Sequence, residues 1–189
     1  MKKNLITAVL MTIAMTILLG LIYPLVVTGL AQVFFRDKAN GQIIVRNGQA
    51  IGSRLIAQPF AEAKYFHPRE SAAGNGYDPT NSNGSQLGPT NQKLIDRVKS
   101  DVAAFQQENP GKPIPVDMVT TSASGLDPDI SPANAEFQIP RVAKARGIPE
   151  AMVRALVEKY TAQRELGLLG EPRVNVLELN LALDDMSGK

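Results

Sequence analysis

Residues 4–35 read NLITAVLMTIAMTILLGLIYPLVVTGLAQVFF, and this stretch decides the architecture of the chain. It contains no charged residue and consists mainly of Leu, Ile, Val, Ala and Met. A helix that crosses a bilayer needs about 20 mostly apolar residues, so the stretch is long enough with a margin. We therefore predict a transmembrane helix over residues 5–35, preceded by a short tip at residues 1–4.

The charges that flank this helix indicate its orientation. They are Lys2 and Lys3 before the helix and Arg36, Asp37 and Lys38 after it. Positive residues close to a membrane helix prefer the cytoplasmic side. We expect a single-pass protein of the inner (plasma) membrane, with the N-terminus in the cytoplasm and residues 36–189 outside it.

A cleaved signal peptide is the alternative interpretation of the same stretch. Gly29 and Ala31 resemble the small residues of a cleavage site. However, the apolar region of a signal peptide spans only about 7–15 residues, and this one is much longer. The length favours a retained anchor.

Several residues inside the helix indicate that it has a helical partner. Pro24 removes one backbone hydrogen bond and tends to kink a helix, which a membrane tolerates where neighbouring helices satisfy the freed carbonyl. Small or hydroxylated residues, which favour helix contacts in lipid, accompany it at Thr7, Thr12, Thr16, Gly20, Thr28 and Gly29. We expect the partner interface to include Gly20, Tyr23, Pro24, Thr28 and Gly29.

The remaining composition excludes several classes of protein. The net charge is +2, and without Lys2 and Lys3 the chain has 18 basic residues against 18 acidic ones, so a basic nucleic-acid-binding face is not expected. There is no cysteine and only one histidine. Disulfides and thiolate sites are therefore excluded, and a zinc site would need carboxylate ligands almost alone, which zinc rarely accepts.

Residues 36–189 are predicted to form one small mixed domain. Its helices and strands intermingle without a regular βαβ alternation, which favours an α+β fold. The first predicted elements are a hairpin over 42–56 around Asn47-Gly48, a long irregular loop over 67–90, and a helix that residues 88–91 (GPTN) open and residues 109–111 (NPG) end. A strand over 116–119 and a polar loop over 120–125 follow. The last elements are a helix capped by Ser131 that Pro140 kinks or restarts, a helix from Pro149 that Gly167 and Gly170 stop, a strand over 174–177 and an apolar element over 179–183.

Few residues of this domain form a pattern with known chemistry. Gly111-Lys112 is a Gly-Lys pair that lacks the first glycine and the hydroxyl of a P-loop. Asp127 and Asp129 flank Pro128, which indicates a turn better than a calcium loop, since further oxygen ligands at regular spacing are missing. His67 has no second histidine or cysteine beside it and is interpreted as structural. A solvated helix face is the simplest interpretation of Arg141, Lys144 and Arg146.

A membrane-anchored hydrolase of the Ser–Lys type is the competing class. It requires a serine whose proton a desolvated lysine accepts. Serines are frequent between Ser122 and Ser131, but Lys112 and Lys144 are not at a diagnostic spacing from them. No catalytic signature therefore supports this alternative.

The chain resembles the C subunits of the Kdp potassium-transporting ATPases, the KdpC family. The matching strings, in order along almost the whole chain, are Tyr23-Pro24-Leu25, Ala39-Asn40-Gly41, Gly52-Ser53-Arg54-Leu55-Ile56, residues 65–72 (YFHPRESA), residues 120–127 (TTSASGLD), residues 138–146 (QIPRVAKAR) and residues 174–180 (VNVLELN). The departures, such as Ala57 where the family has glycine, are small.

This resemblance implies an accessory, non-catalytic subunit of a high-affinity potassium uptake complex, needed for assembly and activity. It also implies a chaperone-like effect that raises the ATP affinity of the ATPase subunit. The partners would be a channel-like potassium-binding subunit and a P-type ATPase subunit. ATP with Mg and potassium would belong to those partners, with no cofactor on this chain alone. Since only residues 1–4 are predicted on the ATP side, an indirect effect is expected.

The matched strings also supply candidate interface residues outside the membrane. These are Tyr65, Phe66, His67, Arg69 and Asp127.

Overall fold

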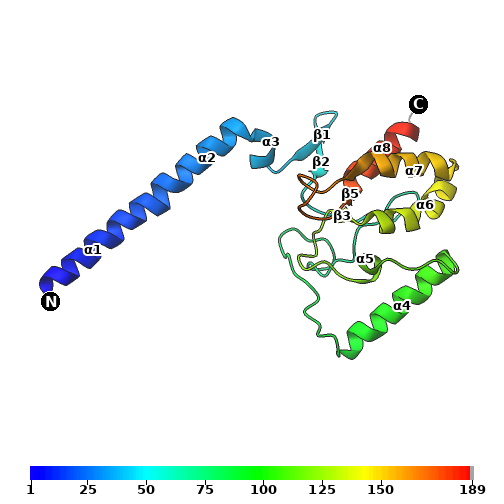
Figure 1. Ribbon diagram of the computed structural model, residues 1–189, viewed down its shortest axis with the longest axis horizontal. Helices are drawn as coiled ribbons and strands as arrows, with labels where there is room; N and C mark the ends of the chain where they lie inside the picture. Colours follow the sequence, from blue (N-terminus) through cyan, green and yellow to red (C-terminus); the bar gives the residue numbers. More distant parts are fainter. Residues whose placement is uncertain (188–189) are drawn as a thin grey trace. The chain divides into compact units, whose positions relative to one another are not determined.

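The computed structural model describes residues 1–187, and the chain divides into two compact units, Met1–Ile43 and Ile44–Lys189 (Figure 1). The last two residues of the predicted outer domain, 188 and 189, lie outside the described residues. The first unit is helical, and the second mixes helices with short strands. The predicted α+β class with one N-terminal apolar helix is confirmed.

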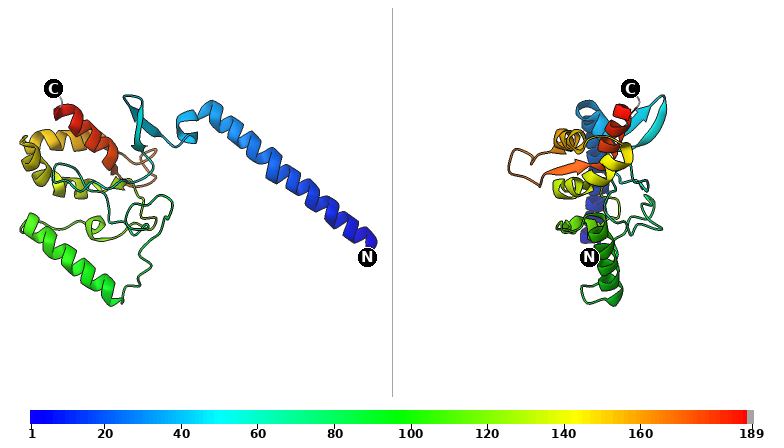
Figure 2. Two further views of the ribbon diagram at one scale, coloured as in Figure 1. Left: turned by 180° about the vertical axis from the view of Figure 1, so that it is seen from behind. Right: turned by 90° about the vertical axis from the view of Figure 1, so that its right-hand side faces the viewer.

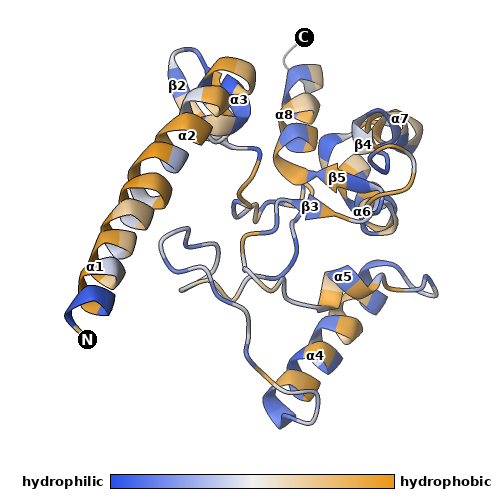
Figure 3. Ribbon diagram, turned by 60° about the vertical axis from the view of Figure 1, so that its left-hand side comes forward, coloured by the Kyte–Doolittle hydropathy of each residue, from blue (hydrophilic) through white to orange (hydrophobic). Residues whose placement is uncertain are grey.

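The first unit is one long helix followed by a single turn. Its consecutive parts are α1 (Lys2–Ile17), the π-helical segment η1 (Leu18–Ile22) and α2 (Tyr23–Phe34), and the added turn is α3 (Arg36–Ala39). None of the residues of this helix is buried, and apolar colouring predominates along it (Figure 3). The helix Lys2–Phe34 is long and apolar enough to cross a membrane.

A π-helical turn precedes Pro24. The Tyr23 N–H donates to the carbonyl of Leu18, five residues earlier, and Pro24 then stands in the first turn of α2. Proline has no N–H to donate and its ring crowds the preceding turn, whereas the first turn of a helix tolerates it. The helix therefore continues through Pro24 without a break, with the wider turn on its N-terminal side.

The second unit begins with the predicted hairpin. β1 (Ile43–Arg46) pairs with β2 (Gln49–Ser53). Asn47 and Gly48 have φ of 50° and 77°, the left-handed values that a two-residue hairpin turn of this type requires. The turn is confirmed, although the second strand ends at Ser53 and not at Ile56.

Three helices and a small antiparallel sheet build the core of this unit (Figure 2). They are α6 (Pro132–Arg146), α7 (Glu150–Tyr160) and α8 (Val176–Ser187), with strands in the order β3 (Asp129–Ile130), β5 (Arg173–Asn175) and β4 (Thr161–Ala162). In the sheet, Ile130 and Thr161 both pair with Val174. The buried residues of the core are Phe66, Ile130, Ala135, Ile139, Val142, Ala143, Val153, Val157, Val174, Val176, Leu179 and Leu183.

The limits of α6 follow from its capping residues. Ser131 Oγ accepts from the Asn134 N–H at 3.0 Å, and Pro132 occupies the first turn, as predicted. At the other end Gly147 adopts φ 66°, the left-handed conformation that commonly ends a helix. The helix continues through Pro140 to Arg146 as one element, so Pro140 does not restart it.

The helix α4 (Gln92–Glu108) lies beside this core and is attached to it at its C-terminal end (Figure 1). Asn91 caps its start by accepting from the Lys93 N–H, and Asn109 ends it, as predicted. The buried Asn109 donates to the Phe137 carbonyl at 3.0 Å, and the Phe105 and Phe137 rings meet edge to face. No residue of α4 is fully buried.

The prediction of a strand over 116–119 is wrong. These residues form a single helical turn, α5 (Val116–Val119), in which the Thr120 N–H donates to the Val116 carbonyl at 3.1 Å. The carboxylate of Asp117 caps the start of α6, accepting from both the N–H and the hydroxyl of Ser131. The main chain of this segment thus bonds locally and does not pair with a strand.

The C-terminal third also differs from the prediction. The helix α7 ends at Tyr160 and not at Gly167, because Thr161 turns into β4 and pairs with β5. The strand predicted over 174–177 is shorter, since α8 begins at Val176. Asn175 Oδ1 accepts from the Glu178 N–H at 3.1 Å, so the Asn-x-x-Glu spacing is a helix cap and the element over 179–183 is helical.

Candidate functional site

Two buried amide side chains hold the main chain of the segment 63–67 against the core helices. Asn180 of α8 accepts from the Phe66 N–H at 2.8 Å and donates to the Phe66 carbonyl at 2.9 Å. Gln138 of α6 does the same for His67, at 2.8 and 3.1 Å. Each pair of bonds resembles one rung of a strand ladder, supplied here by side chains.

Two arginines of α6 complete the attachment of this segment. Arg141 donates to the carbonyls of Ala63 and Tyr65 at 2.7 and 2.9 Å. Arg146 donates to the Lys64 carbonyl at 2.7 Å and forms an ion pair with Asp184 at 2.8 Å. The side chains of Arg141 and Arg146 are only 16% and 5% exposed, so the interpretation of a solvated helix face is wrong for these two residues.

His67 lies half-buried at the end of this attachment. Its Nε2 is 3.2 Å from the Glu62 carbonyl oxygen and 3.4 Å from Arg141 Nη1. Burial, and next the charge of Arg141, lower the pKa of His67, because both disfavour the protonated ring. The ring therefore packs as a neutral structural group, in agreement with its interpretation from the sequence.

The ion pair between Arg69 and Asp127 joins the long irregular loop to the segment that directly follows the polar loop at residues 120–125. The two side chains meet at 2.9 Å and are 25% and 31% exposed. Arg69 Nη2 also donates to the Thr121 carbonyl. In the same region the Tyr77 hydroxyl donates to the Arg69 carbonyl at 2.8 Å, and burial raises the pKa of Tyr77 to about 12. The sequence predicted both partners of this ion pair as site residues.

A glycine allows the two loops to approach each other closely. Gly125 has φ +68°, and a Cβ on it would lie 2.7 Å from atoms of Ala73 and Asn83. Ser71 donates from its hydroxyl to the Gly125 carbonyl at 2.6 Å. Both the backbone conformation and the lack of space thus require glycine at this position.

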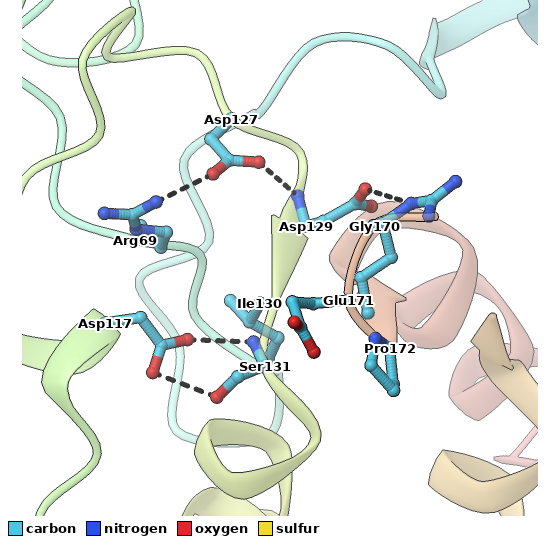
Figure 4. A pocket seen from close by; sticks show the side chains of 10 residues that line it. Arg69, Asp117, Asp127, Asp129, Ile130, Ser131, Gly170, Glu171 and Pro172 are labelled. Carbon is cyan, nitrogen blue, oxygen red and sulfur yellow. Dashed lines mark hydrogen bonds and ion pairs between the residues drawn. The ribbon is translucent and has the colours of Figure 1, made fainter. Parts of the chain in front are cut away.

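An open pocket of about 410 Å³ lies next to this ion pair (Figure 4). Its charged groups are mostly paired: Asp127 with Arg69, Asp129 with Arg173 at 3.1 Å, and Asp117 with the cap of α6. Burial raises the pKa of Asp129, while a hydrogen bond from Asn175 and the charge of Arg173 oppose this shift. The described residues include no group of three His, Cys, Asp or Glu side chains that could hold a metal ion.

The serines considered for catalysis have other surroundings. Ser131 Oγ donates to Asp117 and accepts from Asn134. Ser124 Oγ accepts from the Leu126 N–H, and Ser122 Oγ is buried without a hydrogen-bond partner. None of the three is paired with a lysine, so this geometry gives no support to a Ser–Lys hydrolase.

The Gly111-Lys112 pair lies where a phosphate group is disfavoured. It follows the C-terminus of α4, with Gly111 at φ +77° and the Lys112 N–H donating to the Asn109 carbonyl. Phosphate-binding loops place their amides at the N-terminus of a helix, which carries the positive end of the dipole. These residues therefore do not fit a nucleotide phosphate site.

The predicted interface residues have different surroundings in the two units. Gly20, Tyr23, Pro24, Thr28 and Gly29 are all exposed on the long helix, and no other segment of the first unit covers them. In the second unit Tyr65, His67, Arg69 and Asp127 are half-buried. Phe66, in contrast, is completely buried in the core, so its side chain is not exposed for the partner contact that was predicted for it.

The amides that organise this region were not predicted from the sequence. Asn134, Gln138 and Asn180 are all at most 2% exposed, and Gln138 also donates to Asn134 at 2.7 Å. The pattern that could have indicated them is a polar residue within the apolar face of a helix. Asn180, close to Leu179 and Leu183, is an example. Such a residue needs a buried partner, but the partner is not evident without the tertiary structure.

Comparison with known proteins adds a family relationship to this geometry. The family model described as "K+-transporting ATPase, c chain" matches residues 5–185. The chain is 70% identical over 184 residues to the potassium-transporting ATPase KdpC subunit of Koribacter versatilis, covering 97% of this chain and 95% of that protein. It is 59% identical over 184 residues to the KdpC subunit of Acidobacterium capsulatum, covering 97% and 99%.

Proposed function

We propose that this chain is an accessory and non-catalytic subunit of an ATP-driven potassium uptake complex, because it belongs to the KdpC family of K+-transporting ATPase c chains. The observation that carries the proposal is the extent of the family match, residues 5–185, which includes both the apolar helix and the mixed outer unit. Its partners would be a channel-like potassium-binding subunit and a P-type ATPase subunit.

The two units have separate roles in this proposal. The helix Lys2–Phe34 anchors the chain and contacts helices of a partner, since none of its apolar residues is buried by the chain itself. The outer unit is held rigid by the internal contacts of residues 63–67 and by the Arg69–Asp127 ion pair.

The proposed effect on ATP affinity is indirect. The partner subunits would bind ATP together with Mg, and they would also bind potassium. The surroundings of Gly111-Lys112 in this chain support the absence of a phosphate site at that pair. A subunit that binds one conformation of the ATPase more tightly raises ATP affinity if ATP favours the same conformation. Contact between this chain and the nucleotide is not required.

The proposed location is the inner membrane, with the N-terminus in the cytoplasm and the outer unit outside. A reporter enzyme that is active only outside the cytoplasm, fused after Lys189 (beyond the described residues), tests the orientation. We expect an active reporter and a mature chain that retains Met1 or Lys2. A mature chain that begins near Gln32 would show a cleaved signal peptide and refute the anchor.

Membership of the complex is tested by co-purification. An affinity-tagged chain is recovered from detergent-solubilised membranes, and we expect a channel-like subunit and a P-type ATPase subunit to be recovered with it. The matched control attaches residues 36–189 to an unrelated membrane helix, which separates the contribution of the helix from that of the outer unit. Recovery of the tagged chain alone would contradict the proposal.

A further inference from the structure

Between β4 and β5 the chain forms a narrow hairpin whose tip carries three exposed leucines. Leu166, Leu168 and Leu169 are 90%, 81% and 61% exposed. The right-hand view of Figure 2 shows this orange segment projecting beyond the body of the second unit. Large apolar side chains gathered at one exposed place mark a contact site more often than single exposed ones do.

The backbone holds this tip in one shape. Glu165 and Leu169 exchange two hydrogen bonds, each of 2.9 Å, and the Leu168 N–H donates to the Glu165 carbonyl at 3.1 Å. Leu166 has φ +53° and is followed by Gly167 at +75°. Residues other than glycine and asparagine rarely adopt this left-handed conformation. The turn therefore presents its leucines outward in a fixed arrangement, which lowers the entropic cost of binding.

The charged side chains at the base of the hairpin form ion pairs. Arg164 forms an ion pair with Glu171, and Arg173 forms ion pairs with Asp129 at 3.1 Å and Glu165 at 3.7 Å. Both arginines are thus engaged by carboxylates of the same region. An apolar centre with a paired polar rim is the usual composition of a protein–protein contact.

We infer that this leucine hairpin, residues 164–171, docks into an apolar groove on another subunit of the potassium transporter. The inference rests on the proposed function. An anionic lipid surface is disfavoured as the occupant, because it attracts unpaired basic residues and the two arginines here are paired. A second copy of this chain is disfavoured because three leucines cover far less than the roughly 800 Å² per partner that a stable dimer buries. A partner already held in the same complex needs only a small additional contact.

The test uses the whole complex, purified through a tag on this chain. The double variant Leu166→Asn with Leu168→Ser removes the apolar tip, and asparagine tolerates the left-handed turn. The matched control is Val116→Ser, a 73% exposed apolar residue elsewhere on the unit. We expect the double variant to lose partner subunits on washing at least tenfold faster than the wild type, with unchanged thermal unfolding of the chain itself and no effect of the control.

The outcomes separate this inference from the proposed function. If the wild-type chain recovers no transporter subunit, the proposed function fails. If the wild type and the double variant recover the subunits equally well, only the hairpin contact is refuted. Photocrosslinking from Leu168→p-benzoylphenylalanine in membranes identifies the occupant: a crosslink to a transporter subunit supports the inference, whereas crosslinks only to lipid or to a second copy overturn it.

Discussion

The side-chain amide of Asn180 forms both hydrogen bonds of the Phe66 main chain, accepting from its N–H at 2.8 Å and donating to its carbonyl at 2.9 Å. The two residues are 114 positions apart in the chain, and both are at most 1% exposed. The last helix of the protein thereby fixes the segment that leads into the long irregular loop. Gln138, Arg141 and Arg146 attach neighbouring residues of the same segment to the core.

Replacement of Asn180 by alanine is expected to destabilise the second unit strongly. It leaves two buried backbone groups of Phe66 without partners, and each costs about 1–3 kcal/mol. We expect the free energy of unfolding to fall by about 2–4 kcal/mol, measured by urea denaturation of the detergent-solubilised chain. The control Asn81→Ala, at an exposed loop position, should change it by less than about 0.5 kcal/mol. Equal effects of the two variants would contradict the role assigned to Asn180.

The ion pair between Arg69 and Asp127 is expected to contribute a measurable coupling energy. Both side chains are partly exposed, so we expect about 1 kcal/mol in a double-mutant cycle of Arg69→Met and Asp127→Asn. Arg69→Met should cost more than Asp127→Asn, because Arg69 also donates to the Thr121 carbonyl. Urea unfolding of the four chains gives the coupling. A value indistinguishable from zero would show that the two loops are held together without this pair.

His67 should make the stability of the folded chain depend on pH. Its pKa is lowered by burial and by Arg141 in the folded state, so the unfolded chain binds the proton more readily. Between the lowered pKa and the ordinary value of about 6.5, the unfolded state holds more protons and the free energy of unfolding rises with pH. We expect stability to decrease as the pH is lowered through about 6.5.

The variant His67→Gln isolates this titration, because the chain contains no other histidine. Thermal unfolding measured between pH 5.5 and 7.5 should show a smaller dependence on pH in the variant. Parallel curves for the two chains would mean that His67 does not titrate differently in the folded and unfolded states.

Replacement of residues 5–35 by poly-leucine is expected to preserve membrane insertion but weaken the complex. Small residues and the π-turn before Pro24 give no advantage in lipid alone, whereas helix contacts in a membrane are worth about 0.6–2 kcal/mol each. We expect recovery of partner subunits to fall by about tenfold, which corresponds to about 1.4 kcal/mol. The triple variant Tyr23→Leu, Pro24→Leu and Gly29→Leu should reproduce most of this loss. Unchanged recovery would show that the helix is only a tether.

Photolabelling of the assembled complex with a reactive ATP analogue tests the indirect mechanism. We expect labelled peptides in the ATPase subunit only, and lower ATPase activity when residues 36–189 are removed, since coupling between distant sites needs no shared ligand contact. Specific labelling of any peptide beyond Arg36 would overturn both the orientation and the indirect effect on ATP affinity.

Local patterns predicted many elements of this fold correctly. The Asn47-Gly48 turn, the start of a helix after Asn91, the cap at Ser131 and the apolar helix at the N-terminus each depend on neighbouring residues and were confirmed. The strand predicted over 116–119 was wrong because a four-residue segment with three apolar residues is compatible with a strand or a helical turn. The Asn175 cap of α8 was visible in the spacing to Glu178 but was interpreted as part of a strand.

The sequence by itself determined the apolar helix and the family relationship, because both depend on the order of residues along the chain. Only the tertiary structure decided that Arg141 and Arg146 hold the main chain of residues 63–65, and that Phe66 belongs to the core. It also decided that Asn180 bonds to the main chain of Phe66 and Gln138 to that of His67. These contacts join residues more than 70 positions apart. Since a buried polar group is satisfied by whatever the fold brings beside it, its partner is not specified by neighbouring residues.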